Sequence, residues 1–169
     1  MATLQQAMTI VHQSMISQAQ FAHDRDAKRV VVMLQADPGT GKTSCLQQGA
    51  EETGARSSIL SIAQYDPGEF PGWTVSQGDG MVRLRPDWMP VNTPEEQARA
   101  EAGEVVGWLI VDEPQNAPTM MMNILAQLVN ERRVGRHYLP DGWAIVLAGN
   151  KDSNRAGTNK MPTHLRDRL

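Results

Sequence analysis

The chain lacks several of the features that define common protein classes. It has a single cysteine, Cys45, so no internal disulfide can form and a reducing, cytoplasmic compartment is favoured. Its four histidines are scattered and no Cys/His cluster exists, which argues against a zinc site. No apolar run is long enough to span a bilayer, and the N-terminus has no basic segment followed by a continuous apolar stretch. We therefore expect neither a membrane protein nor a signal peptide.

An excess of one charge sign is also missing. The 16 basic residues are balanced by 19 acidic ones, giving a formal charge of −3. A protein that binds the nucleic-acid backbone is usually basic, so bulk charge does not indicate a nucleic-acid partner. The length of 169 residues suits one domain, and a hydrophobic content of 40% is enough for one core.

Residues 1–23 contain no Lys, Arg, Asp or Glu, and their apolar residues recur at helical spacing. This pattern predicts an amphipathic helix that packs on the rest of the domain or on a neighbouring subunit. We assign residues 1–28 to this helix and its connection, and residues 29–169 to the main core. The apolar positions of the expected helix are Leu4, Met8, Val11, Met15, Ala19 and Ala22.

A glycine-rich turn follows the apolar run 30–34 and precedes the helix-compatible segment 44–52. Strand, glycine-rich turn and helix are the context of a phosphate-binding P-loop (Walker A). Lys42 is expected to reach the β- and γ-phosphates of ATP, and the Thr43 hydroxyl to hold Mg²⁺. Ala36 stands where the strict pattern has glycine. The candidate nucleotide-binding residues are Asp37, Pro38, Gly39, Thr40, Gly41, Lys42, Thr43 and Ser44.

Two further apolar runs end in polar residues. The run 105–111 ends at Asp112 and Glu113, the pattern of a Walker B strand, in which Asp112 binds Mg²⁺ and Glu113 polarises the attacking water. The run 143–148 is followed by Asn150, which can bond the γ-phosphate or that water. In isolation, a strand ending at two surface acids and an asparagine in a turn would be the simpler interpretations.

Apolar runs alternate with helical patterns along the chain, which predicts an α/β fold with a parallel sheet. Ligands of such sheets bind at the carboxyl ends of the strands, where all three polar motifs are expected. Strands are predicted at 30–34, 57–63, 105–111 and 143–148, and helices at 44–52, 94–102 and 117–131.

Two connections carry separate predictions. The interval 64–103 is long for a connection, with a short exposed strand expected at 81–85, and such loops are usually functional or mobile. Within it, Phe70 and Trp73 lie in a Pro/Gly-rich loop and either grip a partner or anchor the loop to the core. The basic segment 132–136 is predicted to be a solvated loop.

The order of these motifs resembles the AAA+ ATPases. It runs from Pro38-Gly39-Thr40-Gly41-Lys42-Thr43 through Asp112-Glu113 and Gly149-Asn150 to Leu165-Arg166-Asp167-Arg168-Leu169. Leu139-Pro140-Asp141-Gly142 and Met161-Pro162 make the chain similar to the MoxR-related, dynein-related group. The resemblance covers about residues 30–169.

The resemblance implies a P-loop NTPase core of three αβα layers, with ATP and Mg²⁺ bound. Thr43 and Asp112 would serve the metal, Glu113 would be the catalytic base and Asn150 the sensor 1 residue. Arg168, or failing that Arg166, would be an arginine finger that reaches the neighbouring subunit's site. The full-length protein would form a homo-oligomeric, hexameric ring.

The chain departs from the family because it ends before the fifth core strand and the small helical lid. We therefore expect the P-loop strand at an edge of the sheet. The expected function is a Mg-dependent ATPase acting as a remodelling motor or chaperone. The alternatives are a nucleotide-gated binding module with little turnover, and a helicase-loader-type ATPase. A GTPase is not expected, because no guanine-reading motif is present.

Overall fold

The computed structural model describes residues 3–21, 24 and 29–150, and its centre is a four-stranded parallel sheet. The strand order is β1 (Val32–Ala36), β8 (Trp143–Asn150), β5 (Gly107–Asp112) and β2 (Arg56–Leu60). All three strand pairs are parallel, as the sequence predicted. Within the described residues β1 pairs only with β8, so the P-loop strand lies at the edge of the sheet.

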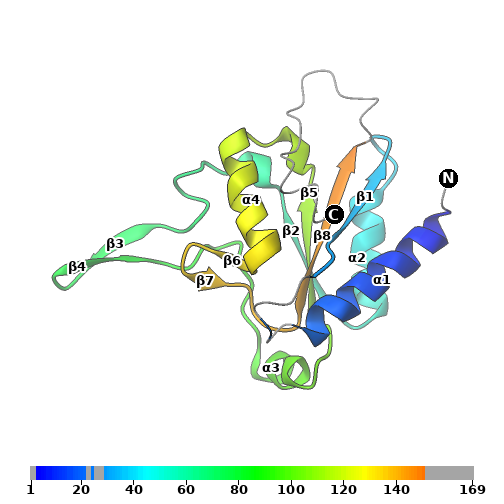
Figure 1. The fold of residues 1–169 in the computed structure, drawn as a ribbon, viewed down its shortest axis with the longest axis horizontal. Helices are drawn as coiled ribbons and strands as arrows, with labels where there is room; N and C mark the ends of the chain where they lie inside the picture. Colours follow the sequence, from blue (N-terminus) through cyan, green and yellow to red (C-terminus); the bar gives the residue numbers. More distant parts are fainter. Residues whose placement is uncertain (1–2, 22–23, 25–28, 151–169) are drawn as a thin grey trace.

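Helices cover both faces of this sheet and form three layers (Figure 1). Helices α1 (Leu4–Gln20) and α2 (Lys42–Glu52) lie on one face, and α4 (Thr119–Glu131) lies on the other. Helix α3 (Pro94–Glu101) lies beyond the amino ends of the strands. No described helix is long and apolar enough to cross a membrane.

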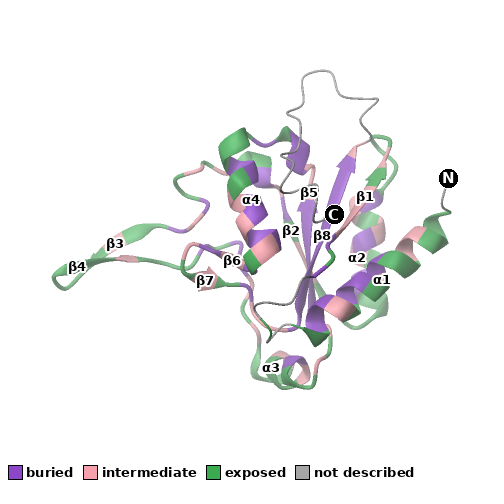
Figure 2. Cartoon of the chain, viewed as in Figure 1, coloured by how far each residue is buried: buried purple, intermediate pink, exposed green. Residues whose placement is uncertain are grey.

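Strands β5 and β8 are buried on both faces (Figure 2), because each face packs against a separate apolar cluster. Trp108 and Ile110 pack with α1 and α2, whereas Leu109 and Val111 pack with α4. This period of two explains why the two runs are continuously apolar in the sequence.

Helix α1 packs on its own domain, and a buried glutamine joins it to the sheet. Thr3 starts the helix with a capping box, and Val11, Met15 and Ala19 are buried. The side-chain amide of Gln18 donates to the carbonyl of Ile145 at 2.9 Å and accepts from its N–H at 2.8 Å. Because β1 begins pairing with β8 only at Val146, Gln18 satisfies the β8 backbone just before β1 starts to pair.

The long connection after β2 contains more structure than predicted. It holds the 3₁₀ helix η1 (Ile62–Gln64) and an antiparallel hairpin, β3 (Thr74–Gln77) with β4 (Gly80–Arg83), that projects away from the body (Figure 1). The first of these strands was missed, because both strands are largely exposed and carry little apolar alternation.

The two aromatic residues of the Pro/Gly loop have separate roles. Phe70 is fully buried and stacks on Trp88 with ring centroids 4.7 Å apart, so it anchors the loop to the core. Trp73, by contrast, is 64% exposed. Only Trp73 is therefore still available to contact a partner.

The prediction of a solvated loop at 132–136 was wrong. The segment forms a small hairpin of β6 (Arg133–Val134) and β7 (His137–Tyr138), and Arg132 is only 5% exposed. The Arg132 guanidinium donates to the carbonyls of Pro140 and Trp143. Burial lowers the pKa of Arg132 to about 10, with nearby Arg29 adding to the lowering, so the side chain stays charged at neutral pH.

Candidate active site

The carboxyl ends of β1, β5 and β8 bring the three sequence motifs together. Asp112 is the last residue of β5, Asn150 is the last residue of β8, and the glycine-rich turn follows β1 directly. The strand register places Ala36 beside Asn150 and Asp112 beside Ala148. Residues from distant parts of the sequence therefore share one edge of the sheet.

The glycine-rich turn has the backbone of an anion-binding loop. Gly39 and Gly41 have φ angles of 73° and 77°, which side chains other than glycine rarely adopt. A Cβ at either position would meet no atom within 4 Å, so the space above the turn is open. Helix α2 starts at Lys42, and its N-cap, Gly41, provides no side-chain hydrogen bond. The turn and helix start therefore fit a phosphate group.

Lys42 is the central cation of this edge and is buried to 9% exposure. Its Nζ donates to Oδ1 of Asn150 at 2.9 Å and to the carbonyl of Asp37 at 3.2 Å. The amide nitrogen of Asn150 then donates to Oε1 of Glu113 at 2.9 Å. Lys42, Asn150 and Glu113 thus form one hydrogen-bonded series of side chains from three different strand ends.

Thr43 and Asp112 form a second contact beside this series. The Thr43 hydroxyl donates to Oδ1 of Asp112 at 3.0 Å. A hydroxyl and a carboxylate in contact are suitable oxygen ligands for Mg²⁺, which usually keeps several waters and phosphate oxygens as its other ligands. No group of three His, Cys, Asp or Glu residues that could hold a metal occurs in the described part of the chain.

Glu113 is held in an unusual backbone conformation. Its φ of 44° is left-handed, and its N–H donates to the carbonyl of Ala148 at 2.8 Å. A non-glycine residue in this region costs about 1–2 kcal/mol, so the surrounding bonds must enforce it. The conformation turns the carboxylate of Glu113 toward Asn150.

Asn116 is a site residue that the sequence did not reveal. It ends the 3₁₀ helix η2 (Pro114–Asn116), and its amide donates to Oε2 of Glu113 at 2.7 Å. Both oxygens of Glu113 therefore accept from asparagine amides. The available signal was its spacing of three residues after Glu113, which a short turn brings back to the carboxylate.

Gly149 allows neighbouring side chains to pack closely against its backbone, which the sequence around Asn150 did not predict. A Cβ at Gly149 would lie 2.1 Å from Cε of Met33 and 3.0 Å from Oε1 of Gln115. Gln115 is itself 1% exposed. The absence of a side chain at Gly149 thus lets β1 and η2 pack closely beneath the site.

The remaining candidate residues fall into two groups. Asp37, Pro38, Thr40 and Ser44 lie exposed in or next to the turn, where the Thr40 hydroxyl donates to the carbonyl of Asp37 at 2.8 Å. Arg166 and Arg168, the candidate arginine fingers, lie outside the described residues.

Comparison with known proteins supports the fold but not a narrower assignment. No family model and no curated protein match the chain. The solved structures similar to it include a provisionally assigned ATPase from Cytophaga hutchinsonii, with a TM-score of 0.55, 15% identity and 95% of this chain covered. A RuvB mutant from Thermotoga maritima has a TM-score of 0.53, 14% identity and 98% of this chain covered. An MCM homologue from Methanopyrus kandleri has a TM-score of 0.51, 17% identity and 83% of this chain covered.

The chain shares the three-layer P-loop NTPase fold of these structures. The described residues include no helical lid subdomain. The chain covers 43% of the Cytophaga and RuvB chains and 28% of the MCM homologue, so it spans less than half of each. At these identities the similarity concerns the fold alone.

Proposed function

We propose that this chain is the nucleotide-binding core of a Mg-dependent AAA+ ATPase. The observation that carries the proposal is the junction of the Lys42–Asn150–Glu113 series and the Thr43–Asp112 pair at one edge of a parallel sheet. A cation, two acidic groups and an open glycine-rich turn are together what binding and hydrolysis of a nucleoside triphosphate require.

Each residue then has a specific part in binding. The backbone N–H groups of the turn and of the start of α2 bind the phosphates. Lys42 replaces its hydrogen bond to Asn150 with one to a phosphate oxygen. Thr43 and Asp112 would hold Mg²⁺, and the ion would neutralise charge that develops on the phosphates. Lys42 already bonds to Asn150, and Thr43 already bonds to Asp112. These side chains therefore need little rearrangement to bind the nucleotide and the metal.

Hydrolysis needs a group that positions and polarises water, and Glu113 is the best candidate. Its carboxylate adjoins Asn150, which in turn adjoins Lys42, so a water beside Glu113 would lie close to the γ-phosphate. Each oxygen of Glu113 accepts one asparagine N–H and keeps a second lone pair that can accept a proton. A water bound beside Glu113 can also replace the Asn150 amide. Asn150 then becomes free to bond the γ-phosphate.

The finer assignments follow from the family resemblance. We propose a MoxR-related, dynein-related remodelling motor or chaperone that acts in the cytoplasm as a homo-hexameric ring on an unidentified protein substrate. Arg168, or else Arg166, would act in the neighbouring subunit's site. The similarity to RuvB and MCM structures is consistent with an AAA+ ring ATPase.

A second candidate is a nucleotide-gated binding module with little turnover. It is favoured by the two amide bonds to Glu113, which occupy both of its oxygens. With this carboxylate held by the two amides, the site would bind nucleotide without positioning a water for attack. Turnover measurements on the full chain distinguish the two candidates.

The assignment of the nucleotide site is tested by calorimetry with ATP and Mg²⁺. Lys42→Ala should weaken ATP binding by at least about tenfold, because it removes a charge-assisted hydrogen bond. Asp112→Ala should weaken the Mg²⁺-dependent part of binding.

Matched controls remove the same charges elsewhere. Arg136→Ala and Asp79→Ala alter exposed residues away from the site and should leave ATP affinity unchanged. Unchanged affinity in both Lys42→Ala and Asp112→Ala would disprove the site assignment.

The arginine finger is tested by mixing inactive subunits. Arg168→Ala and Glu113→Gln subunits should each be inactive alone, since a finger contributes about 10³–10⁵-fold in related phosphoryl transfer. Mixed rings contain some interfaces with an intact Glu113 and an intact Arg168, so activity should return. Arg166→Ala is the control, and mixtures that exchange subunits without regaining activity would rule out a finger at Arg168.

A further inference from the structure

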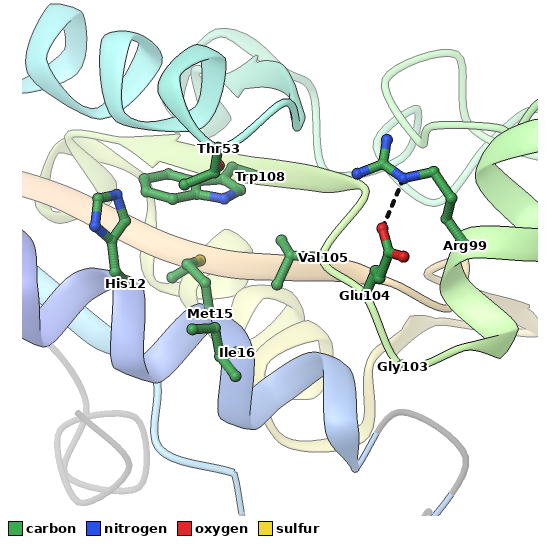
Figure 3. A pocket seen from close by; sticks show the side chains of 9 residues that line it. All are labelled: His12, Met15, Ile16, Thr53, Arg99, Gly103, Glu104, Val105 and Trp108. Atoms are coloured by element: carbon green, nitrogen blue, oxygen red, sulfur yellow. Dashed lines mark hydrogen bonds and ion pairs between the residues drawn. The ribbon is translucent and has the colours of Figure 1, made fainter.

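A cavity of about 330 Å³ lies at the end of the sheet opposite the nucleotide site. Its walls come from α1, the end of α2, Arg99 of α3, and β5 with the segment that leads into it (Figure 3). Trp108, which lines it, precedes Asp112 by four residues, so about 13 Å of strand separates the two. The cavity is therefore separate from the nucleotide site.

The wall of this cavity contains a buried hydrogen-bond donor with no acceptor. Trp108 is 1% exposed, and its Nε1 has no partner among the described residues. The other two buried tryptophans differ, because Trp88 donates to the carbonyl of Phe70 at 2.9 Å and Trp143 donates to Asn92 at 2.8 Å. A buried indole normally finds an acceptor, so the unsatisfied Trp108 indicates a ligand atom.

The rest of the lining is apolar in the middle and charged at one end. Met15, Ile16 and Val105 lie between His12 on one side and Arg99 with Glu104 on the other (Figure 3). His12 packs edge-on against Trp108, with ring centroids 5.3 Å apart. The middle of the cavity thus suits an apolar body rather than a sugar or a nucleotide.

The charged end can accept an anion. Arg99 donates to Glu104 at 2.8 Å and to the carbonyl of Gly54 at 3.3 Å. A guanidinium has five N–H donors, so these two bonds leave others for a carboxylate. The ion pair with Glu104 is partly exposed and therefore weak, which allows the arginine to turn toward a ligand.

We infer that this cavity binds a small apolar carboxylic acid. The acid group lies toward Arg99, an oxygen accepts from Nε1 of Trp108, and the apolar part fills the space beside Met15, Ile16 and Val105. The volume lies at the lower end of the range for small-molecule sites, which excludes large ligands. Since the cavity borders α1 and β5 at once, its ligand would join the N-terminal helix to the strand that carries Asp112.

The test uses 4-phenylbutyrate as the probe and the indole N–H signals of ¹⁵N-labelled protein as the readout, without nucleotide. The signal of Trp108, assigned with Trp108→Phe, should shift in a saturable way, whereas those of Trp88 and Trp143 should not. The neutral 4-phenylbutanamide should bind about threefold more weakly, because its contact with Arg99 loses the charge. No saturable shift up to the solubility limit, or equal binding of acid and amide, would overturn the proposal.

Two matched variants on α1 locate the binding. Ile16 lines the cavity and Ile10 does not, yet the two are 51% and 53% exposed, so neither substitution disturbs the core. Ile16→Phe should weaken the probe about tenfold or more by filling its space, and Ile10→Phe should not. Trp108→Phe keeps an aromatic side chain but loses the donor and part of the ring volume, so affinity measured by calorimetry should fall roughly three- to tenfold.

Equal effects of the two isoleucine variants would overturn the assignment to this cavity. Because no step of this test involves ATP, its failure would leave the proposed nucleotide site unaffected.

Discussion

Two groups of polar side chains bond differently: the group at the carboxyl ends of the strands bonds side chain to side chain, whereas the group at the start of β8 bonds to the backbone. Lys42, Asn150 and Glu113 form the first kind of network. Arg132 and Gln18 represent the second, since both bond to main-chain groups at the start of β8.

The difference has a physical reason. Side chains that bond to each other can exchange partners for a ligand at little cost, because every group finds a new partner. Side chains that satisfy buried backbone groups cannot leave without exposing those groups to an apolar environment. The first end of the sheet is therefore suited to chemistry and the second to holding the fold together.

The substitution Glu113→Gln is expected to show the largest difference between the two ends of the sheet, because it affects activity and not stability. The amide keeps the shape of the side chain but cannot accept a proton, so hydrolysis should fall by about 10²–10⁴-fold. ATP affinity and the melting temperature should change little. Parallel measurement of turnover, calorimetry and thermal unfolding checks all three, and a variant that hydrolyses ATP at the parent rate would support the binding-module alternative.

The amino end should respond in the opposite way. Arg132→Ala removes charge-assisted bonds to two carbonyls and should lower the free energy of unfolding by about 2–4 kcal/mol. Any molecules that remain folded should bind ATP as the parent does. Denaturant titration combined with calorimetry measures both quantities.

The adjacent arginine provides the control for that experiment. Arg133 is partly exposed and pairs with Glu131, so Arg133→Ala should change stability by no more than about 0.5 kcal/mol. An equal loss in the free energy of unfolding from Arg132→Ala and Arg133→Ala would show that the buried bonds of Arg132 do not stabilise the fold more than an exposed ion pair does.

Asn116 lies at the carboxyl end, and Glu113 is the one candidate residue to which its side chain hydrogen-bonds in the described structure. The smallest effect on turnover is therefore expected here. Asn116→Ala removes one of two amides on that carboxylate and should change the turnover number by less than about tenfold. Stability should stay constant. A loss as large as that of Glu113→Gln would mean that Asn116 positions the base and is essential for it.

Local sequence patterns were sufficient for most of the carboxyl end, although not for Asn116. The turn at Gly39 and Gly41 follows β1, the acids stand at the end of β5 and Asn150 ends β8, so short segments disclose them. The parallel sheet then places them together, because the carboxyl ends of parallel strands share one edge. The α/β fold with its parallel sheet followed from the alternation of strands and helices, whereas the AAA+ type of core was implied only by the resemblance of the motif order to that family.

The amino end was not predictable in this way. The sequence around Arg132 is basic and resembles a solvated loop, and nothing local shows that Pro140 and Trp143 present carbonyls to it. Likewise, Gln18 bonds to Ile145, which is 127 residues away. Phe70 and Trp73 look alike in sequence but differ in burial, and the partners of Phe70, Trp88 and Tyr65, come from other segments of the chain.

The sequence by itself determined the P-loop, the order along the chain of the four strands of the parallel sheet and their helices, and the residues that end β5 and β8. Each of these depends on backbone preference or periodicity over a few neighbouring positions. The tertiary structure alone decided which polar groups are buried, that Asn116 turns back to Glu113, and that Trp108 faces a cavity without an acceptor. Burial and hydrogen-bond satisfaction depend on groups brought together from distant parts of the chain, and only the packed fold specifies those.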